Sequence, residues 1–252
     1  MRVPLVKLGS LLLLCARPFA PVSAFGLEDF RVQRPDFCQV DDRYGELPGG
    51  GYYHCTPTSV ANHLYELAKE FPNLISSKEQ SLKDLVEIIR ILSSKDYMNC
   101  VDGTYTENMM KGLEKYVKER GYNISIKYAG PRDIEGYSCD KKVTTEWIKK
   151  ELKDGSNLIL NADYYKNGEN DSSEFIGSHC VTIVGFNDDK GFKLYIHDPA
   201  KRSGIEPQTE TCDLVSSPDS RLEIKGIKLK SRSDIAFIGE IVAFKIEHPK
   251  GR

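Results

Sequence analysis

The hydrophobic pattern of the chain changes its period once, near Gly155. Before this point apolar residues recur every three or four positions, which predicts helices, and after it they form alternating or β-branched runs, which predict strands. The predicted helices cover residues 58–71, 82–92, 107–120 and 144–152, and the predicted strands cover 157–162, 180–186, 192–196 and 240–246. Helices followed by a largely antiparallel sheet indicate an α+β fold.

The first 24 residues differ from the rest of the chain. Arg2 and Lys7 precede an apolar run over 8–16, and small residues follow at 22–24. This is the pattern of a secretory signal peptide, and the run is shorter than the ~20 residues that cross a bilayer. We therefore expect a signal peptide at 1–24 and a single domain over 25–252. That domain is expected to be secreted or lumenal, with no membrane anchor once the signal is removed.

The charge of the remaining chain is mildly acidic. Loss of 1–24 removes three basic residues and no acidic ones, so the formal net charge changes from −2 to −5. An acidic surface argues against nucleic acid as a partner. Sequons at Asn123 and Asn170 are compatible with a secreted, glycosylated chain.

Six of the seven cysteines remain after residue 24. They are Cys38, Cys55, Cys100, Cys139, Cys180 and Cys212. In an oxidising compartment the simplest expectation is three disulfides. Four of them lie in polar or turn-rich surroundings and are expected to form two bridges, whose pairing the sequence does not give: Cys38, Cys100, Cys139 and Cys212. Cys180 lies in a β-branched run and is expected to be a free core thiol, which leaves Cys55 without a disulfide partner.

A predicted hairpin places a histidine beside a carboxylate. The polar segment 187–191 separates two predicted strands and is typical of a hairpin turn. With the turn centred there, residues whose numbers sum to about 379 face each other, so Val181 lies near Asp198. His179 is then diagonal to Asp198 on the same face. A register shift of one residue would place the two side chains on opposite faces.

Cys55 stands immediately before a predicted helix. The positive end of a helix dipole and a nearby imidazolium both favour thiolate over thiol, so Cys55 is a candidate nucleophile with His179 as its base. A carboxylate at Asp198 would hold His179 in one tautomer and stabilise its charged form. No His and Cys residues have zinc-ligand spacing, and we expect no metal and no cofactor.

Three segments resemble a known family. Residues 53–62, 177–186 and 196–200 are similar to the Cys, His and Asp motifs of papain-like cysteine peptidases related to the bacteriocin-leader-processing (C39) peptidases. The segments between them are also similar to secreted members of that group, so the resemblance spans about 35–200. It implies a papain-like α+β fold, with the nucleophile helix in the helical first half and an antiparallel sheet in the second half.

The resemblance also implies roles for four residues. Cys55 would be the nucleophile, His179 the base and Asp198 the residue that orients it. Such enzymes carry a glutamine before the cysteine as a second oxyanion donor, and Gln39 is similar to that element although it lies 16 residues before Cys55.

Two positions depart from the family pattern. Thr56 stands where glycine is common after the cysteine, and Ser178 stands where a second glycine often precedes the histidine. Thr56 would narrow the site or change how a substrate backbone approaches it. Neither departure removes a reacting group.

The expected function is that of a secreted cysteine peptidase, which acts on a peptide or protein substrate through an acyl-enzyme. An amidase or acyl transferase would use the same triad with a different acceptor, and the sequence does not separate these activities. Two non-enzymatic alternatives remain open. One is a secreted papain-like binding protein with an inaccessible Cys55, and the other is a structural domain with all six remaining cysteines paired.

Overall fold

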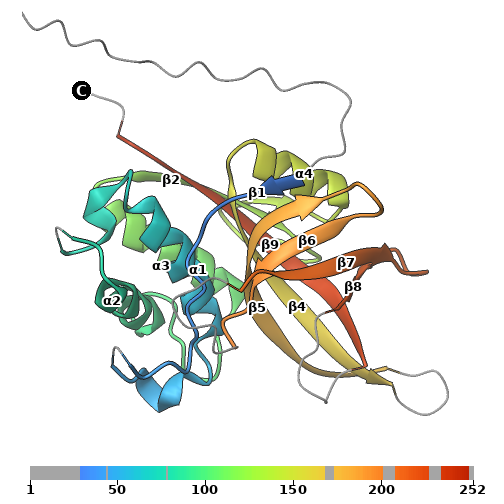
Figure 1. The fold of residues 1–252 in the computed structure, drawn as a ribbon, viewed down its shortest axis with the longest axis horizontal. Coiled ribbons are helices and arrows are strands. Elements are labelled where there is room, and N and C mark those ends of the chain that lie inside the picture. Colours follow the sequence, from blue (N-terminus) through green and yellow to red (C-terminus); the bar gives the residue numbers. More distant parts are fainter. Residues whose placement is uncertain are drawn as a thin grey trace, which may run out of the picture.

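The computed structural model describes residues 29–43, 45–77, 79–167, 173–200, 208–226 and 234–249. The expected signal peptide and the sequon at Asn170 lie outside these ranges, whereas Asn123 is exposed at the start of a strand. Three helices lie together on one side of a large sheet, and the fourth lies apart from them (Figure 1). The α+β class expected from the sequence is therefore confirmed.

All four predicted helices are present. They are α1 (Cys55–Leu67), α2 (Leu82–Ser93), α3 (Thr106–Glu119) and α4 (Thr145–Lys153). Two short 3₁₀ turns, η1 (Pro48–Gly51) and η2 (Pro72–Leu74), flank α1. Helix α1 begins earlier than predicted, because Pro57 fits the first turn of a helix, where its missing N–H has no partner to lose. Cys55 is consequently the first residue of the helix and not the residue before it.

The sheet has more strands than the sequence predicted. They are β1 (Asp29–Arg31), β2 (Asn123–Ala129), β3 (Ser138–Asp140), β4 (Asn157–Asn167), β5 (Ser173–Asn187), β6 (Lys193–His197), β7 (Glu210–Ser216), β8 (Leu222–Lys225) and β9 (Ile235–Glu247). Strands β1, β2, β3, β7 and β8 were not predicted. Because β2 and β3 lie between α3 and α4, the first half of the chain is not purely helical.

Strand pairing closes part of this sheet into a ring. Consecutive strands from β4 to β9 pair antiparallel, and β9 pairs back onto β4. Strand β1 adds to β5, and β2 adds to β9 and carries β3 in parallel. Closure of this kind removes free strand edges from the ring.

The two faces of the ring strands bury two separate cores. On β4, Leu158 and Leu160 point into the ring together with Ile183 and Ile196, whereas Ile159 points outward to the helices. The outer core includes Leu64 of α1 and further apolar residues of α2 and α3. Each fully buried aliphatic side chain of this kind contributes roughly 1.5–3 kcal/mol of transfer free energy. The outer core therefore fixes α1, and with it Cys55, against the sheet.

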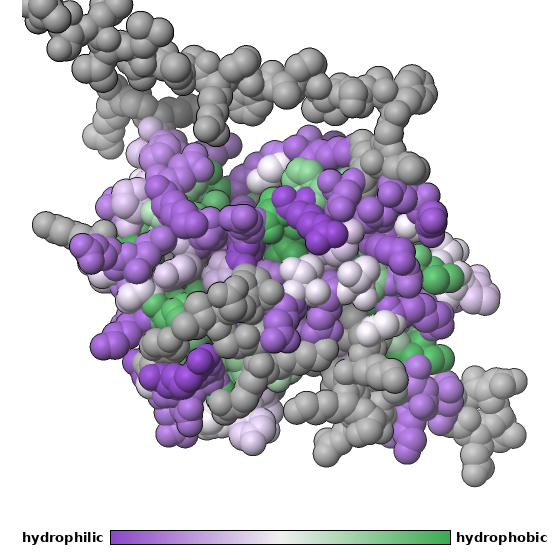
Figure 2. Space-filling view, in the orientation of Figure 1, coloured by the Kyte–Doolittle hydropathy of each residue, from purple (hydrophilic) through white to green (hydrophobic). Residues whose placement is uncertain are grey.

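The exterior is largely hydrophilic on the face that Figure 2 shows, with scattered apolar side chains between the polar ones. Among the helices that the structure describes, none is long and apolar enough to cross a membrane.

The six cysteines of the described chain are all free thiols, so the expected bridges are absent from the structure. The sulfurs of Cys100, Cys139 and Cys212 contact separate backbone groups instead. Cys212 points into the ring and lies 3.7 Å from Leu194 O, and Cys139 Sγ accepts a hydrogen bond from Ile134 N at 3.3 Å. The alternative of a structural domain in which all six of these cysteines are paired therefore also disagrees with the structure.

Candidate active site

A glycine-rich loop delivers Cys55 to the start of α1. Gly49, Gly50 and Gly51 have φ of 62°, 68° and 77°, a left-handed conformation that L residues rarely adopt. At Gly51 a Cβ atom would lie 1.7 Å from the carbonyl oxygen of Gln39. The loop can therefore pack this closely on Gln39 only because residue 51 has no side chain.

Gln39 connects this loop to the segment that carries Asp198. Its Nε2 donates to the carbonyl oxygens of Gly51 and Tyr52, both at 2.9 Å, and its backbone N–H donates to Pro199 O at 2.8 Å. Both amide hydrogens are engaged in this arrangement, so Gln39 supports the loop. The predicted oxyanion role of Gln39 stays a prediction, and it would require the amide to release one of these carbonyls.

The hairpin brings His179 and Asp198 together as predicted. Thr182 pairs with His197 and Ile183 with Ile196, which is the register that the sequence indicated. His179 Nε2 lies 2.6 Å from Asp198 Oδ1, and both residues are buried. Because Nε2 contacts the carboxylate, the other ring nitrogen of His179, Nδ1, is the one left for a further partner.

The pKa values of Cys55 and His179 indicate an ion pair. A hydrogen bond from Cys180 and a second one from His179 lower the pKa of Cys55 well below its ordinary value, against the opposing effect of burial. Burial alone would lower the pKa of His179, but its contacts with Asp198 and Cys55 raise it to about 10. Thiolate and imidazolium are therefore the favoured forms over a wide range of pH.

Cys180 has a larger part in the site than that of an inert core thiol. It is buried and free as expected, but the contact with Cys55 and burial raise its pKa. Its thiol stays protonated beside the Cys55 thiolate and can donate to it. The sequence did not reveal this contact because residues 55 and 180 meet only through the packing of α1 on β5.

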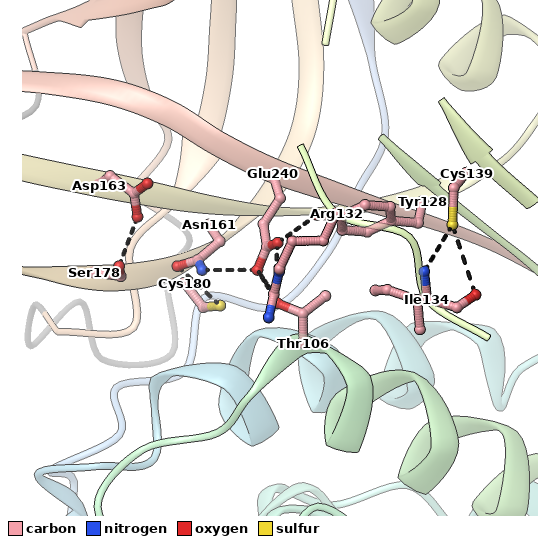
Figure 3. Close-up of polar contacts among 10 residues, drawn as sticks. All are labelled: Thr106, Tyr128, Arg132, Ile134, Cys139, Asn161, Asp163, Ser178, Cys180 and Glu240. Atoms are coloured by element: carbon pink, nitrogen blue, oxygen red, sulfur yellow. Dashed lines mark hydrogen bonds and ion pairs between the residues drawn. The ribbon is translucent and has the colours of Figure 1, made fainter. Parts of the chain in front are cut away.

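A cavity of about 680 Å³ opens beside Cys55, which is partly exposed. Its floor is formed by neighbouring residues of three strands, since Cys180 pairs with Asn161 and Asn161 pairs with Glu240. Two residues further along β4, and on the same face, Asp163 pairs with Ser178. Figure 3 shows these side chains in a row across the sheet.

Glu240 is the most extensively bonded of these floor residues. Tyr128 donates to it at 2.7 Å, Arg132 at 2.9 Å and Asn161 at 3.3 Å, and Thr106 is a fourth donor (Figure 3). Burial opposes the charged form, but these hydrogen bonds lower the pKa of Glu240. Glu240 thus ties α3 and the 131–132 segment to the sheet as a buried carboxylate.

The histidine of the Asp motif, which precedes Asp198, is structural. His197 Nδ1 lies 3.1 Å from Pro35 O, and Nε2 lies 3.1 Å from Thr209 Oγ1. These contacts point it away from the reacting groups. Within the described ranges, no three His, Cys, Asp or Glu side chains lie together in a way that would hold a metal ion.

The α+β fold and the grouping of Cys55, His179 and Asp198 are compatible with a papain-like, cysteine-peptidase-like domain, which the family match below supports. Residues 33–213 match the model of the Peptidase_C39 like family, and the chain belongs to that family. No curated protein matched the chain. Because the match ends at 213, strands β8 and β9, and therefore Glu240, lie beyond it.

Proposed function

We propose that this protein is a thiol hydrolase that cleaves peptide bonds through an acyl-enzyme on Cys55. The observation that carries the proposal is the contact between His179 and Asp198 beside a thiol whose pKa is lowered. A nucleophile, a base and a group that orients the base are the parts that acyl transfer at a thiol requires.

The chemistry would follow in two steps. The Cys55 thiolate attacks the substrate carbonyl carbon, and the His179 imidazolium gives its proton to the departing amine as the C–N bond breaks. Neutral His179 then takes a proton from water, which attacks the thioester and releases the acid and the Cys55 thiolate, so that the ion pair with His179 is restored. Asp198 stabilises His179 while it is charged.

The start of α1 would stabilise the oxyanion. The first N–H groups of a helix have no partner within it, and they lie at the positive end of the helix dipole. Pro57 has no N–H, so Cys55 and Thr56 supply the donors of this turn. The side chain of Thr56 is buried and forms part of the cavity lining beside Cys55.

Export of the protein is a further part of this proposal and rests on the pattern of residues 1–24. N-terminal sequencing of the exported chain tests it. A mature chain that begins near Phe25 would support it, and an intact Met1 would contradict it.

Mass spectrometry during peptide turnover tests the hydrolase. The wild-type protein is incubated with a mixed peptide library, and the products and any thioester on Cys55 are identified. Cys55→Ala and His179→Ala should abolish cleavage, whereas Cys139→Ala, a control at a thiol outside the cavity, should retain it. Equal cleavage by wild type and Cys55→Ala would overturn the proposal. Cleavage of non-peptide amides or acyl transfer to an added amine would identify the amidase or transferase variant.

A further inference from the structure

The cavity beside Cys55 carries an excess of negative charge. Its lining includes the carboxylates of Asp102, Asp163 and Glu240 and a single basic group, Arg132. Arg132 already pairs with Glu240 at 2.9 Å. A charged ligand that enters the cavity therefore meets a field that favours cations.

Asp163 differs from Glu240 in how its charge is compensated. Its hydrogen bond comes from Ser178 Oγ, which donates to Oδ1 at 2.6 Å, and no lysine or arginine of the described chain forms an ion pair with it. Burial raises the pKa of Asp163. The carboxylate of Asp163 fits against residue 239 only because that residue is glycine. A Cβ at Gly239 would lie 2.5 Å from Asp163 Oδ2. Arg132 and Arg221 attract Asp163 only from a distance, without forming an ion pair with it. A half-buried carboxylate without an ion-pair partner is a group that a cationic ligand would stabilise strongly.

Aromatic side chains stand exposed on the lining of the same cavity. Tyr105 is 78% exposed and Phe175 is 54% exposed. Val101 is another exposed apolar side chain of this lining, and the exposed Ile176 is the chain neighbour of Phe175. Aromatic faces attract cations and cover the aliphatic stems of long basic side chains.

We propose that this cavity binds a lysine or arginine side chain of the substrate, with Asp163 as the residue that determines specificity. Tyr105 and Phe175 would contact the aliphatic part of that side chain. The identity of the ligand as a peptide side chain rests on the proposed hydrolase function. The preference of the cavity for a cation does not depend on that function.

Charged thiol reagents test the cation preference without any catalysis. A methanethiosulfonate reagent transfers its thioalkyl group to the Cys55 thiolate, forming a mixed disulfide as a sulfinate anion departs. Trimethylammonium-ethyl, sulfonato-ethyl and methyl reagents carry positive, negative and no charge. Modification of Cys55 is followed by peptide mapping so that other thiols do not contribute.

The rate at which each reagent modifies Cys55 is divided by the rate at which the same reagent modifies a free model thiol. After this correction, we expect the cationic reagent to modify Cys55 faster than the anionic one. In Asp163→Asn this ratio should fall about fivefold, which is the size of a partly screened charge interaction. Asp133→Asn is the matched control, since Asp133 is 82% exposed, pairs with Lys141 and lies outside the cavity lining. Equal rates with the methyl reagent verify that each variant keeps the site intact. An unchanged ratio in Asp163→Asn would overturn the proposal.

A substrate comparison separates this proposal from the hydrolase proposal. Peptides that differ only in lysine or norleucine, its uncharged counterpart, are offered at each position around the cleaved bond. Cleavage should be faster with lysine at one position, and Asp163→Asn should remove that preference. If the thiol reagents show the expected charge preference but no peptide is cleaved, the cation subsite is supported and the hydrolase proposal is rejected. Cleavage without a lysine or arginine preference would retain the hydrolase and reject this subsite.

Discussion

His179 Nε2 lies 2.6 Å from Asp198 Oδ1, and both groups are buried where β5 meets the residue that follows β6. The contact joins two residues that a hairpin of fixed register brings together. It also reverses the effect of burial on the imidazole, because His179 has a pKa of about 10 although burial alone would lower it. A histidine held in its charged form beside Cys55 is one of two reasons to expect an unusually reactive thiol, the other being the hydrogen bond from Cys180.

Replacement of His179 by alanine should move the pH dependence of Cys55 alkylation. In the wild type, a lowered Cys55 pKa and a His179 pKa of about 10 define the range in which the ion pair exists. The thiolate forms as pH rises through the lowered Cys55 pKa, so its midpoint should be acid-shifted. Without the imidazolium the midpoint should rise, and alkylation by iodoacetamide at pH 6 should fall by at least about tenfold, which corresponds to one unit of pKa. Identical profiles of the two proteins would contradict the ion pair.

Asp198→Asn should lower the pKa of His179 by more than about one unit, because a neighbouring carboxylate raises the pKa of an imidazole by about that amount or more. Asparagine keeps a hydrogen-bond acceptor of the same size, so the ring should stay in place. The measurement is an NMR titration of the imidazole nitrogens. The resonances of His63 and His197, which contact Leu158 O and Pro35 O instead, serve as internal controls. A His179 midpoint that remains near 10 would show that Asp198 is not the cause.

Cys180→Ala should raise the pKa of Cys55 and slow its alkylation, since the largest cause of the low Cys55 pKa is the hydrogen bond from Cys180. Cys180→Ser retains a donor at this position and should restore much of the wild-type midpoint. This pair separates the hydrogen bond from the loss of volume. If serine and alanine gave the same shift, packing and not donation would explain the effect of Cys180.

Glu240→Ala should destabilise the protein by about 2–4 kcal/mol, because it leaves the donors of Thr106, Tyr128 and Arg132 without their shared acceptor. The pKa of Glu240 is lowered on folding, so its contribution to stability is present above the ordinary glutamate pKa and is lost as pH falls through the folded value. Urea unfolding at pH 7 and pH 4 measures both effects. Glu174→Ala, at an exposed position on β5, should change the free energy of unfolding little.

The sequence predicted those parts of the site that depend on local patterns. Helix α1 follows from apolar spacing, and the proximity of His179 to Asp198 follows from a short hairpin whose turn sets the register. Both rest on interactions over fewer than about twenty residues, where periodicity and turn chemistry are informative.

Local sequence patterns did not predict which residues form the cavity floor. Asn161 pairs with Glu240 only because the ring closes between β4 and β9, which no local pattern specifies. The disulfide prediction failed for a related reason. Cys212 lies among polar residues, but alternation along β7 turns its side chain into the ring and its neighbours outward.

The loop before Cys55 permits a matched pair of substitutions. Gly49 and Gly51 both have positive φ, but a Cβ at Gly49 meets nothing within 4 Å, whereas a Cβ at Gly51 would lie 1.7 Å from Gln39 O. Gly49→Ala should therefore cost only the strain of a left-handed residue, about 1 kcal/mol. Gly51→Ala must also displace the backbone of Gln39, which we expect to cost about 3–4 kcal/mol and to slow Cys55 alkylation. Urea unfolding and the alkylation rate measure the two consequences. Equal behaviour of the two variants would mean that the loop does not depend on its close approach to Gln39, and that Cys55 is positioned by α1 alone.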